Sequence, residues 1–188
     1  MSSALTTAKL DRERAILVLV DIQTGFRKAI PGFEGIVSAA ATLAQGAQEL
    51  GVPIVATEQY PKGLGPTVSE LAEQLPEGLE PIAKTRFSAA AADGFDLGGR
   101  DQAIVCGVEA HVCVNQTVLD LLGQGIEVHV VSDAVGSRDP ANRDLGLHKA
   151  ERAGAWLTSV ETALFELLGE AGSDEFKSVQ RLVLEHAP

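Results

Sequence analysis

Continuous apolar runs of strand length recur along the chain, with helix-patterned segments between them. Most of these runs are hydrophobic at every position rather than at alternate ones, which is typical of strands covered on both faces. Such strands belong to parallel sheets sandwiched between helices. The expected strands are Ala15 to Val20, Pro53 to Thr57, Pro81 to Ala83, Gln102 to Cys106, Ile126 to Val131 and a weaker Ala155 to Leu157.

The intervening segments carry helix signals. Gly51 is a helix stop, and Asp139 followed by Pro140 is typical of an N-cap and a first helical residue. Helices are expected at residues 35–50, 114–123, 140–152, 159–168 and 173–185. The alternation predicts an α/β protein, a Rossmann-like three-layer αβα domain that is doubly wound around a mainly parallel six-stranded sheet.

Size and charge limit the function. A chain of 188 residues suits one domain, expected to span residues 1–188. The 26 acidic and 15 basic residues give a net charge of −11, which disfavours nucleic acid or an anionic membrane as partner and favours a small molecule.

Compartment and cysteine state are predicted from the same sequence. No apolar run reaches membrane-spanning length, and Met1 to Asp11 lacks the pattern of a secretory signal. A cytoplasmic protein is expected. Cys106 lies inside a predicted strand and Cys113 follows it, so both are expected to be free thiols in a reducing compartment.

Three ionisable side chains follow the ends of predicted strands. Asp21 follows the first strand, Lys84 the third, and Cys113 the fourth after a short polar step. Ligands of open parallel sheets bind beyond the carboxyl ends of the strands. The three residues therefore form a candidate Cys/Asp/Lys triad.

Each member of the triad has a chemical role and an ordinary alternative. A cysteine at a helix N-terminus favours the thiolate, Asp21 can take up and return its proton, and Lys84 is expected to lower the pKa of both groups. The alternatives are a cysteine that only packs in the core, an aspartate that caps a turn, and a lysine that points to solvent.

Three motifs occur in the order of a known family. Val20 to Phe26, Lys84 to Ala89 and Gly107 to Val114 resemble the isochorismatase-like cysteine hydrolase family, which includes nicotinamidases. Thr57 to Gln59 and Gly107 to Ala110 are similar to isochorismatase-domain proteins of unassigned substrate. The match is collinear over nearly the whole chain and favours Asp21, Lys84 and Cys113 as the triad.

The resemblance implies further features of the site. A cis peptide bond that does not involve proline is expected between Val108 and Glu109, and the backbone amides of Glu109 and Cys113 are expected to form an oxyanion hole. Family members that hydrolyse isochorismate itself typically lack the cysteine. The presence of Cys113 therefore favours attack on a carbonyl or nitrile-like carbon.

The sequence departs from the nicotinamidases at their metal site. Those enzymes carry an aspartate and histidines after the second strand, where this chain has Gln59, Tyr60 and Pro61. The histidines show no ligand spacing; they are His111, His129, His148 and His186. We expect no metal and no cofactor.

Several residues are candidates for the wall of the pocket. Phe26, Gln59, Tyr60 and Phe87 are expected to bind substrate, although both phenylalanines can equally be core residues. His111 is interpreted as a loop residue near the site. Asp133 follows the fifth strand, where an N-cap or loop-bracing role is favoured over catalysis.

These observations support two functions. The first is a metal-independent hydrolase that acts on a small amide or related acyl compound, with a thioester formed on Cys113. The second is a binding or scaffold protein that keeps the fold with little or no catalysis. Self-association into a homo-oligomer is expected, because relatives commonly assemble and the C-terminal helices are rich in alanine and leucine.

Overall fold

The computed structural model describes residues 9–186 and contains a six-stranded sheet in the order β3-β2-β1-β4-β5-β6. Every neighbouring pair of strands is parallel. The predicted three-layer α/β fold is confirmed. The strands are β1 (Ala15–Val20), β2 (Ile54–Gln59), β3 (Ile82–Lys84), β4 (Gln102–Val108), β5 (Glu127–Gly136) and β6 (Trp156–Thr158).

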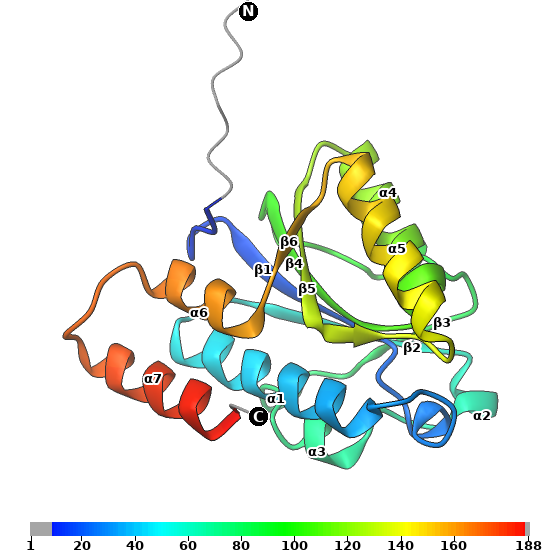
Figure 1. The fold of residues 1–188 in the computed structure, drawn as a ribbon, viewed down its shortest axis with the longest axis horizontal. Helices are drawn as coiled ribbons and strands as arrows, with labels where there is room; N and C mark the ends of the chain where they lie inside the picture. The colour runs from blue at the N-terminus through cyan, green and yellow to red at the C-terminus, as the bar shows by residue number, and fades with distance from the viewer. Residues whose placement is uncertain (1–8, 187–188) are drawn as a thin grey trace, which may run out of the picture.

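Helices cover both faces of the sheet. Figure 1 shows α1, α6 and α7 together on one face and α4 and α5 on the other, in agreement with the contacts among them. The main helices are α1 (Phe33–Glu49), α4 (Asn115–Gly123), α5 (Pro140–Ala153), α6 (Val160–Leu168) and α7 (Asp174–His186); α2 (Pro61–Leu64) and α3 (Ser69–Ala72) are single turns. Among the described residues, no helix combines the length and apolar character that crossing a bilayer requires.

The strand ends differ from the sequence expectation mainly on the carboxyl side. β1 has the expected bounds, whereas β5 continues to Gly136, beyond the expected Val131. Ser132 and Asp133 interrupt the apolar run where the pairing with β4 shifts register. The pairing with β4 resumes at Val135 and Gly136, so the strand continues past the two polar residues. The helix starts follow the predicted chemistry, since the carboxylate of Asp139 accepts a hydrogen bond from the backbone amide of Ala141 at 2.9 Å.

The two central strands are buried along their whole length. Every residue of β1 and of β4 is buried, which explains the continuous apolar runs. The strands approach closely at Gly107, which has a φ of 124° and lies beside Val20. A Cβ atom there would collide with the backbone of Val20, so glycine is required at this position.

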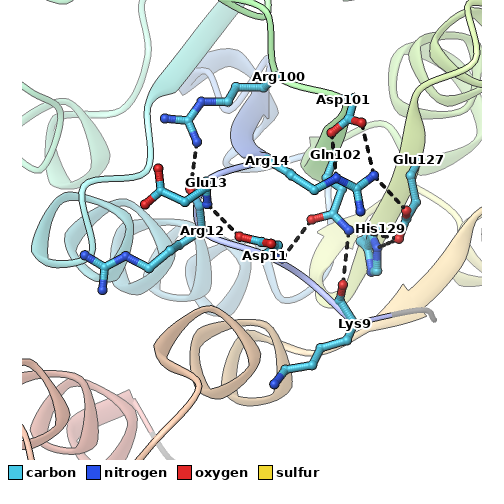
Figure 2. A network of polar contacts seen from close by, with 10 residues as sticks. All are labelled: Lys9, Asp11, Arg12, Glu13, Arg14, Arg100, Asp101, Gln102, Glu127 and His129. Carbon is cyan, nitrogen blue, oxygen red and sulfur yellow. Dashed lines mark hydrogen bonds and ion pairs between the residues drawn. The ribbon is translucent and has the colours of Figure 1, made fainter. Parts of the chain in front are cut away.

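A cluster of polar side chains connects the amino ends of the strands through hydrogen bonds and ion pairs (Figure 2). We call Arg14, Asp101, Gln102, Glu127 and His129 the amino-edge network. The Arg14 guanidinium donates to Asp101 at 2.9 Å and 3.1 Å, and the Nε2 atom of His129 lies 3.0 Å from Oε1 of Glu127. The buried amide of Gln102 binds the backbone of Lys9 and Asp11 and the carboxylate of Glu127. The network ties the start of the described chain to β4 and β5.

Candidate active site

The opposite edge of the sheet holds a buried ion pair between Asp21 and Lys84. β1 and β3 are separated by β2, and the long Lys84 side chain spans this gap. Its Nζ atom lies 2.7 Å from Oδ2 of Asp21, with both side chains almost completely excluded from solvent. The structure therefore brings together two of the residues that the sequence placed at strand ends.

The Lys84 ammonium faces four oxygen atoms. Besides Asp21, Nζ donates to Oε1 of Gln59 at 2.8 Å, to the carbonyl of Phe87 at 2.8 Å and to that of Arg86 at 3.3 Å. An ammonium group has three protons. Protein oxygens surround the group, so the side chain of Lys84 is held in place beside Asp21.

The other oxygen of the Asp21 carboxylate is held by Thr57. The Thr57 hydroxyl donates to Oδ1 at 2.7 Å, because the register of β1 and β2 sets Thr57 beside Val20. Sequence reasoning missed this contact. Its signal was a hydroxyl side chain at the end of an otherwise apolar strand.

Cys113 lies next to this pair but not at the start of α4. It belongs to a π-helical turn, η3 (Ala110–Val114), that precedes α4. Burial raises the pKa of the Cys113 thiol to about 12; the negative charge of Asp21 and its hydrogen bond to the thiol add to this, while Lys84 acts in the opposite direction. The expected thiolate near neutral pH is therefore wrong. Desolvation outweighs the attraction of the ammonium.

The backbone before Cys113 has an unusual conformation. The peptide bond between Val108 and Glu109 is cis, at the position indicated by the family resemblance. The carbonyl of Glu109 accepts hydrogen bonds from the amides of Val112 and Val114 at 3.0 Å and 3.2 Å. On the outer side, Gly146 of α5 packs directly on the backbone of Ala110, where a Cβ atom would collide. The turn that carries the thiol is thus held by hydrogen bonds of its own backbone and by the packing of α5 against it.

A cavity of about 390 Å³ opens on the thiol. Both Glu109 and Cys113 line it, as do Phe26, Gln59 and Phe87. Tyr60 does not: it begins the turn into α2 with a φ of 37°, is 55% exposed, and lines a neighbouring cavity. Gln59 has a second task that the sequence did not indicate, since its side-chain amide joins Lys84 to the carbonyl of Thr85.

The remaining sequence candidates lie outside this cavity. Nδ1 of His111 lies 3.0 Å from the hydroxyl of Ser137. The carboxylate of Asp133 accepts hydrogen bonds from the backbone amide of Val160 at 3.0 Å and 3.2 Å, which confirms the bracing role expected for it. Cys106 is a buried free cysteine, and burial raises the pKa of its thiol.

The histidine, cysteine and acidic side chains of the described residues do not gather into a metal site. Within residues 9–186, no group of three or more of these is arranged to hold a metal ion. The side chain of His186, one of the scattered histidines, lies outside the described part.

The fold and these contacts define a class: an isochorismatase-like α/β protein with a thiol, a carboxylate and an ammonium group gathered at the carboxyl edge of the sheet. The isochorismatase domain model matches residues 15–162, and the chain belongs to the isochorismatase family.

Related proteins support this assignment. The chain is 45% identical over 177 residues to isochorismatase domain-containing protein 2 of Pongo abelii, covering 93% of this chain and 85% of the relative. It resembles the structure of a Caenorhabditis elegans protein named MAR1 ribonuclease, with 39% identity, a TM-score of 0.90 and coverage of 96% and 94%. It also resembles the Escherichia coli YcaC gene product, described as an octameric hydrolase of unknown specificity, with 25% identity, a TM-score of 0.80 and coverage of 96% and 97%.

Proposed function

We propose that this protein is a metal-independent cysteine hydrolase that acts on a small amide or related acyl compound. The observation that carries the proposal is the position of Cys113, whose thiol lines a cavity and hydrogen-bonds the carboxylate of Asp21. The geometry supplies a nucleophile, a proton acceptor in contact with it and a fixed positive charge behind the acceptor.

In the first half of the reaction, the sulfur of Cys113 attacks the carbonyl carbon while the thiol proton moves to Asp21. The high pKa of the thiol favours proton transfer during the attack rather than before it. The amides of Glu109 and Cys113 stabilise the negative oxygen of the tetrahedral intermediate. Asp21 then gives the proton to the leaving nitrogen, the carbon–nitrogen bond breaks, and a thioester remains on Cys113.

In the second half, water attacks the thioester carbon and passes one proton to Asp21. The carbon–sulfur bond breaks, the acid product leaves, and the sulfur regains its proton from Asp21. Lys84 does not exchange protons in this scheme, because its three protons are held by protein oxygens. Its charge offsets the buried negative charge of Asp21 in every cycle.

The test is turnover of a panel of small amides, carbamates, thioesters and a short RNA by the wild type, Cys113→Ala and the matched control Cys106→Ala. We expect the wild type and the control to hydrolyse at least one amide or thioester, and Cys113→Ala to hydrolyse none. Mass spectrometry of the quenched wild-type reaction should detect an acyl group on Cys113.

Other outcomes would favour other functions. Stoichiometric binding without turnover would support the binding or scaffold protein. Cleavage of the RNA alone would extend to this chain the activity named for the Caenorhabditis elegans relative; the net charge of −11 argues against it.

We also propose that the chain forms a homo-oligomer in the cytoplasm. The octameric Escherichia coli relative supports assembly, and light scattering on the purified protein would test it. A single species with the mass of one chain across a wide concentration range would contradict the proposal.

A further inference from the structure

We propose that the hydroxyl of Thr117 is a positioning group, which ties the turn that carries Cys113 to the segment that binds the Lys84 ammonium. The catalytic meaning of this inference rests on the proposed function. The contact itself can be tested on the thiol without turnover.

Thr117 lies in α4, four residues after Cys113, so the two residues are neighbours on one side of the helical segment. Its side chain is completely buried. The hydroxyl donates to the carbonyl of Cys113 at 2.7 Å and accepts a hydrogen bond from the backbone amide of Ala89 at 2.8 Å. A hydroxyl has a single proton, so these two contacts fix its orientation.

The two hydrogen bonds of this hydroxyl reach opposite halves of the site. One holds the turn of the thiol, and the other holds Ala89, which lies two residues after Phe87. The carbonyl of Phe87 accepts a hydrogen bond from Nζ of Lys84 at 2.8 Å, and Nζ lies 2.7 Å from the carboxylate of Asp21. That carboxylate is hydrogen-bonded to the thiol of Cys113. The contacts therefore close a ring through all three members of the triad.

Thr42 in α1 offers a comparison within the same chain. Its hydroxyl donates to the carbonyl of Ser38 at 2.9 Å, also four residues earlier, which is a common contact of threonine in helices. Thr117 makes the same contact and adds a second one, to a segment 28 residues earlier in the chain. The second hydrogen bond makes Thr117 a link between separate parts of the site.

Loss of this link should change the ionisation of the thiol in a defined direction. Burial raises the pKa of Cys113 most, and the charge of Asp21 and its hydrogen bond raise it further, whereas Lys84 lowers it. A turn released from Ala89 gives the thiol more water and a longer distance to Asp21, and both changes lower the pKa. At a fixed pH below that pKa, more of the thiol is then ionised and it is alkylated faster.

The first experiment measures alkylation of Cys113 by iodoacetamide at one mildly alkaline pH, with the modified residue identified by mass spectrometry. Thr117→Val keeps the shape of the side chain without either hydrogen bond, and we expect it to react roughly tenfold faster than the wild type. Thr117→Ser keeps the hydroxyl and should react within about twofold of the wild type. Thr42→Val is the matched control and should react as the wild type. Circular dichroism would establish that each variant is folded.

A double-mutant cycle separates positioning from a general loosening of the fold. If Thr117 acts through the contact between the thiol and Asp21, the effects of Thr117→Val and Asp21→Asn on the alkylation rate should not multiply. We expect the double variant to react within about twofold of the faster single variant.

Turnover of a substrate found in the panel gives a second measurement. Thr117 is not among the residues that line the cavity, so its loss should affect the chemical step more than substrate binding. We expect Thr117→Val to lower kcat by roughly tenfold to a hundredfold with KM changed by less than about threefold, and Thr117→Ser to restore kcat.

Hydrogen exchange tests the contact in the wild type, whether or not Thr117→Val folds. The amide of Ala89 should exchange slowly, because it is held in a buried hydrogen bond. Exchange as fast as that of an unprotected loop amide would overturn the inference.

The inference is also overturned if Thr117→Val is alkylated no faster than the wild type, if Thr117→Ser behaves as Thr117→Val, or if the two effects in the cycle multiply in full. Faster alkylation of Thr117→Val with recovery in Thr117→Ser, but no turnover of any compound by the wild type, would leave the positioning role standing while the hydrolase proposal fails. Turnover by the wild type with unchanged alkylation in Thr117→Val would do the reverse.

Discussion

The two edges of the sheet both carry ion pairs, but they differ in solvent access. At the carboxyl edge, the side chains of Lys84 and Asp21 are 1% and 0% exposed. In the amino-edge network, those of Arg14 and Asp101 are 41% and 58% exposed. Charges at the first edge interact in a medium of low polarity, whereas those at the second are screened by water.

The edges also differ in what their charges face. The carboxyl edge joins its ion pair to a thiol and a cavity. The amino-edge network contains no thiol, and its side chains bind one another and the backbone of Lys9 and Asp11 (Figure 2). An ion pair at a strand end therefore does not by itself indicate a site. A nucleophile and an accessible space beside it are also needed.

The largest effect is expected for Lys84→Met. This variant leaves the Asp21 carboxylate buried without its ammonium partner, so we expect the free energy of unfolding to fall by about 3–5 kcal/mol and turnover to be lost. Denaturant titration and the turnover assay would measure the two effects. If Lys84→Met were as stable and as active as the wild type, the buried ion pair at the carboxyl edge would contribute no more than the exposed pairs at the amino edge.

Asp21→Asn should separate thiol ionisation from catalysis. Because the charge of Asp21 and its hydrogen bond to the thiol raise the pKa of Cys113, this pKa should fall below the wild-type value of about 12. Below its pKa a thiol is mostly protonated, so at a fixed mildly alkaline pH the variant should react faster with iodoacetamide. Turnover should nevertheless drop by roughly 10²–10⁴ for loss of the proton acceptor.

The pH profile of alkylation, with the site of modification identified by mass spectrometry, would test this. Asp101→Asn at the amino edge is the matched control and should leave the profile and the turnover unchanged. Slower alkylation in Asp21→Asn would indicate that Asp21 chiefly maintains the shape of the cavity.

Gln102→Ala should affect stability without affecting chemistry. The change removes the partner of the Asp11 amide, the Lys9 carbonyl and one oxygen of Glu127. We expect a loss of about 1–3 kcal/mol in the free energy of unfolding. The alkylation rate of Cys113 in the folded protein should not change, and a change of tenfold or more would show that the two edges are coupled.

The smallest effect is expected for Arg14→Gln. Its pair with Asp101 is largely exposed, and exposed pairs contribute about 0.2–1 kcal/mol. The difference from the wild type in thermal unfolding should shrink further as salt is added. A loss that is large and independent of salt would mean that this pair acts as a buried one.

Much of the fold follows from local sequence patterns. The strands of a parallel sheet are continuously apolar because both faces are covered, and the carboxyl ends of such strands meet at one edge. These two rules placed Asp21, Lys84 and Cys113 at the same edge of the sheet. The start of the helix after Asp139 could also be predicted from the sequence, because an N-cap depends only on neighbouring residues.

Other features depend on contacts that no local pattern reveals. The pKa of Cys113 reflects burial by distant parts of the chain, and it reversed the expectation drawn from the nearby helix. The roles of Thr57 and Gln59 depend on the register of β1, β2 and β3. The sequence did not place Arg138 beside the cavity, because Ser132 and Asp133 gave β5 an early apparent end.

Phe87 belongs to two parts of the site at once. Its main-chain carbonyl binds Lys84, while its ring lines the cavity and is 51% exposed. Replacing the ring therefore reshapes the cavity but keeps the oxygen that anchors the ammonium. A substitution at this position can therefore alter the shape of the cavity without removing a contact that holds the ammonium.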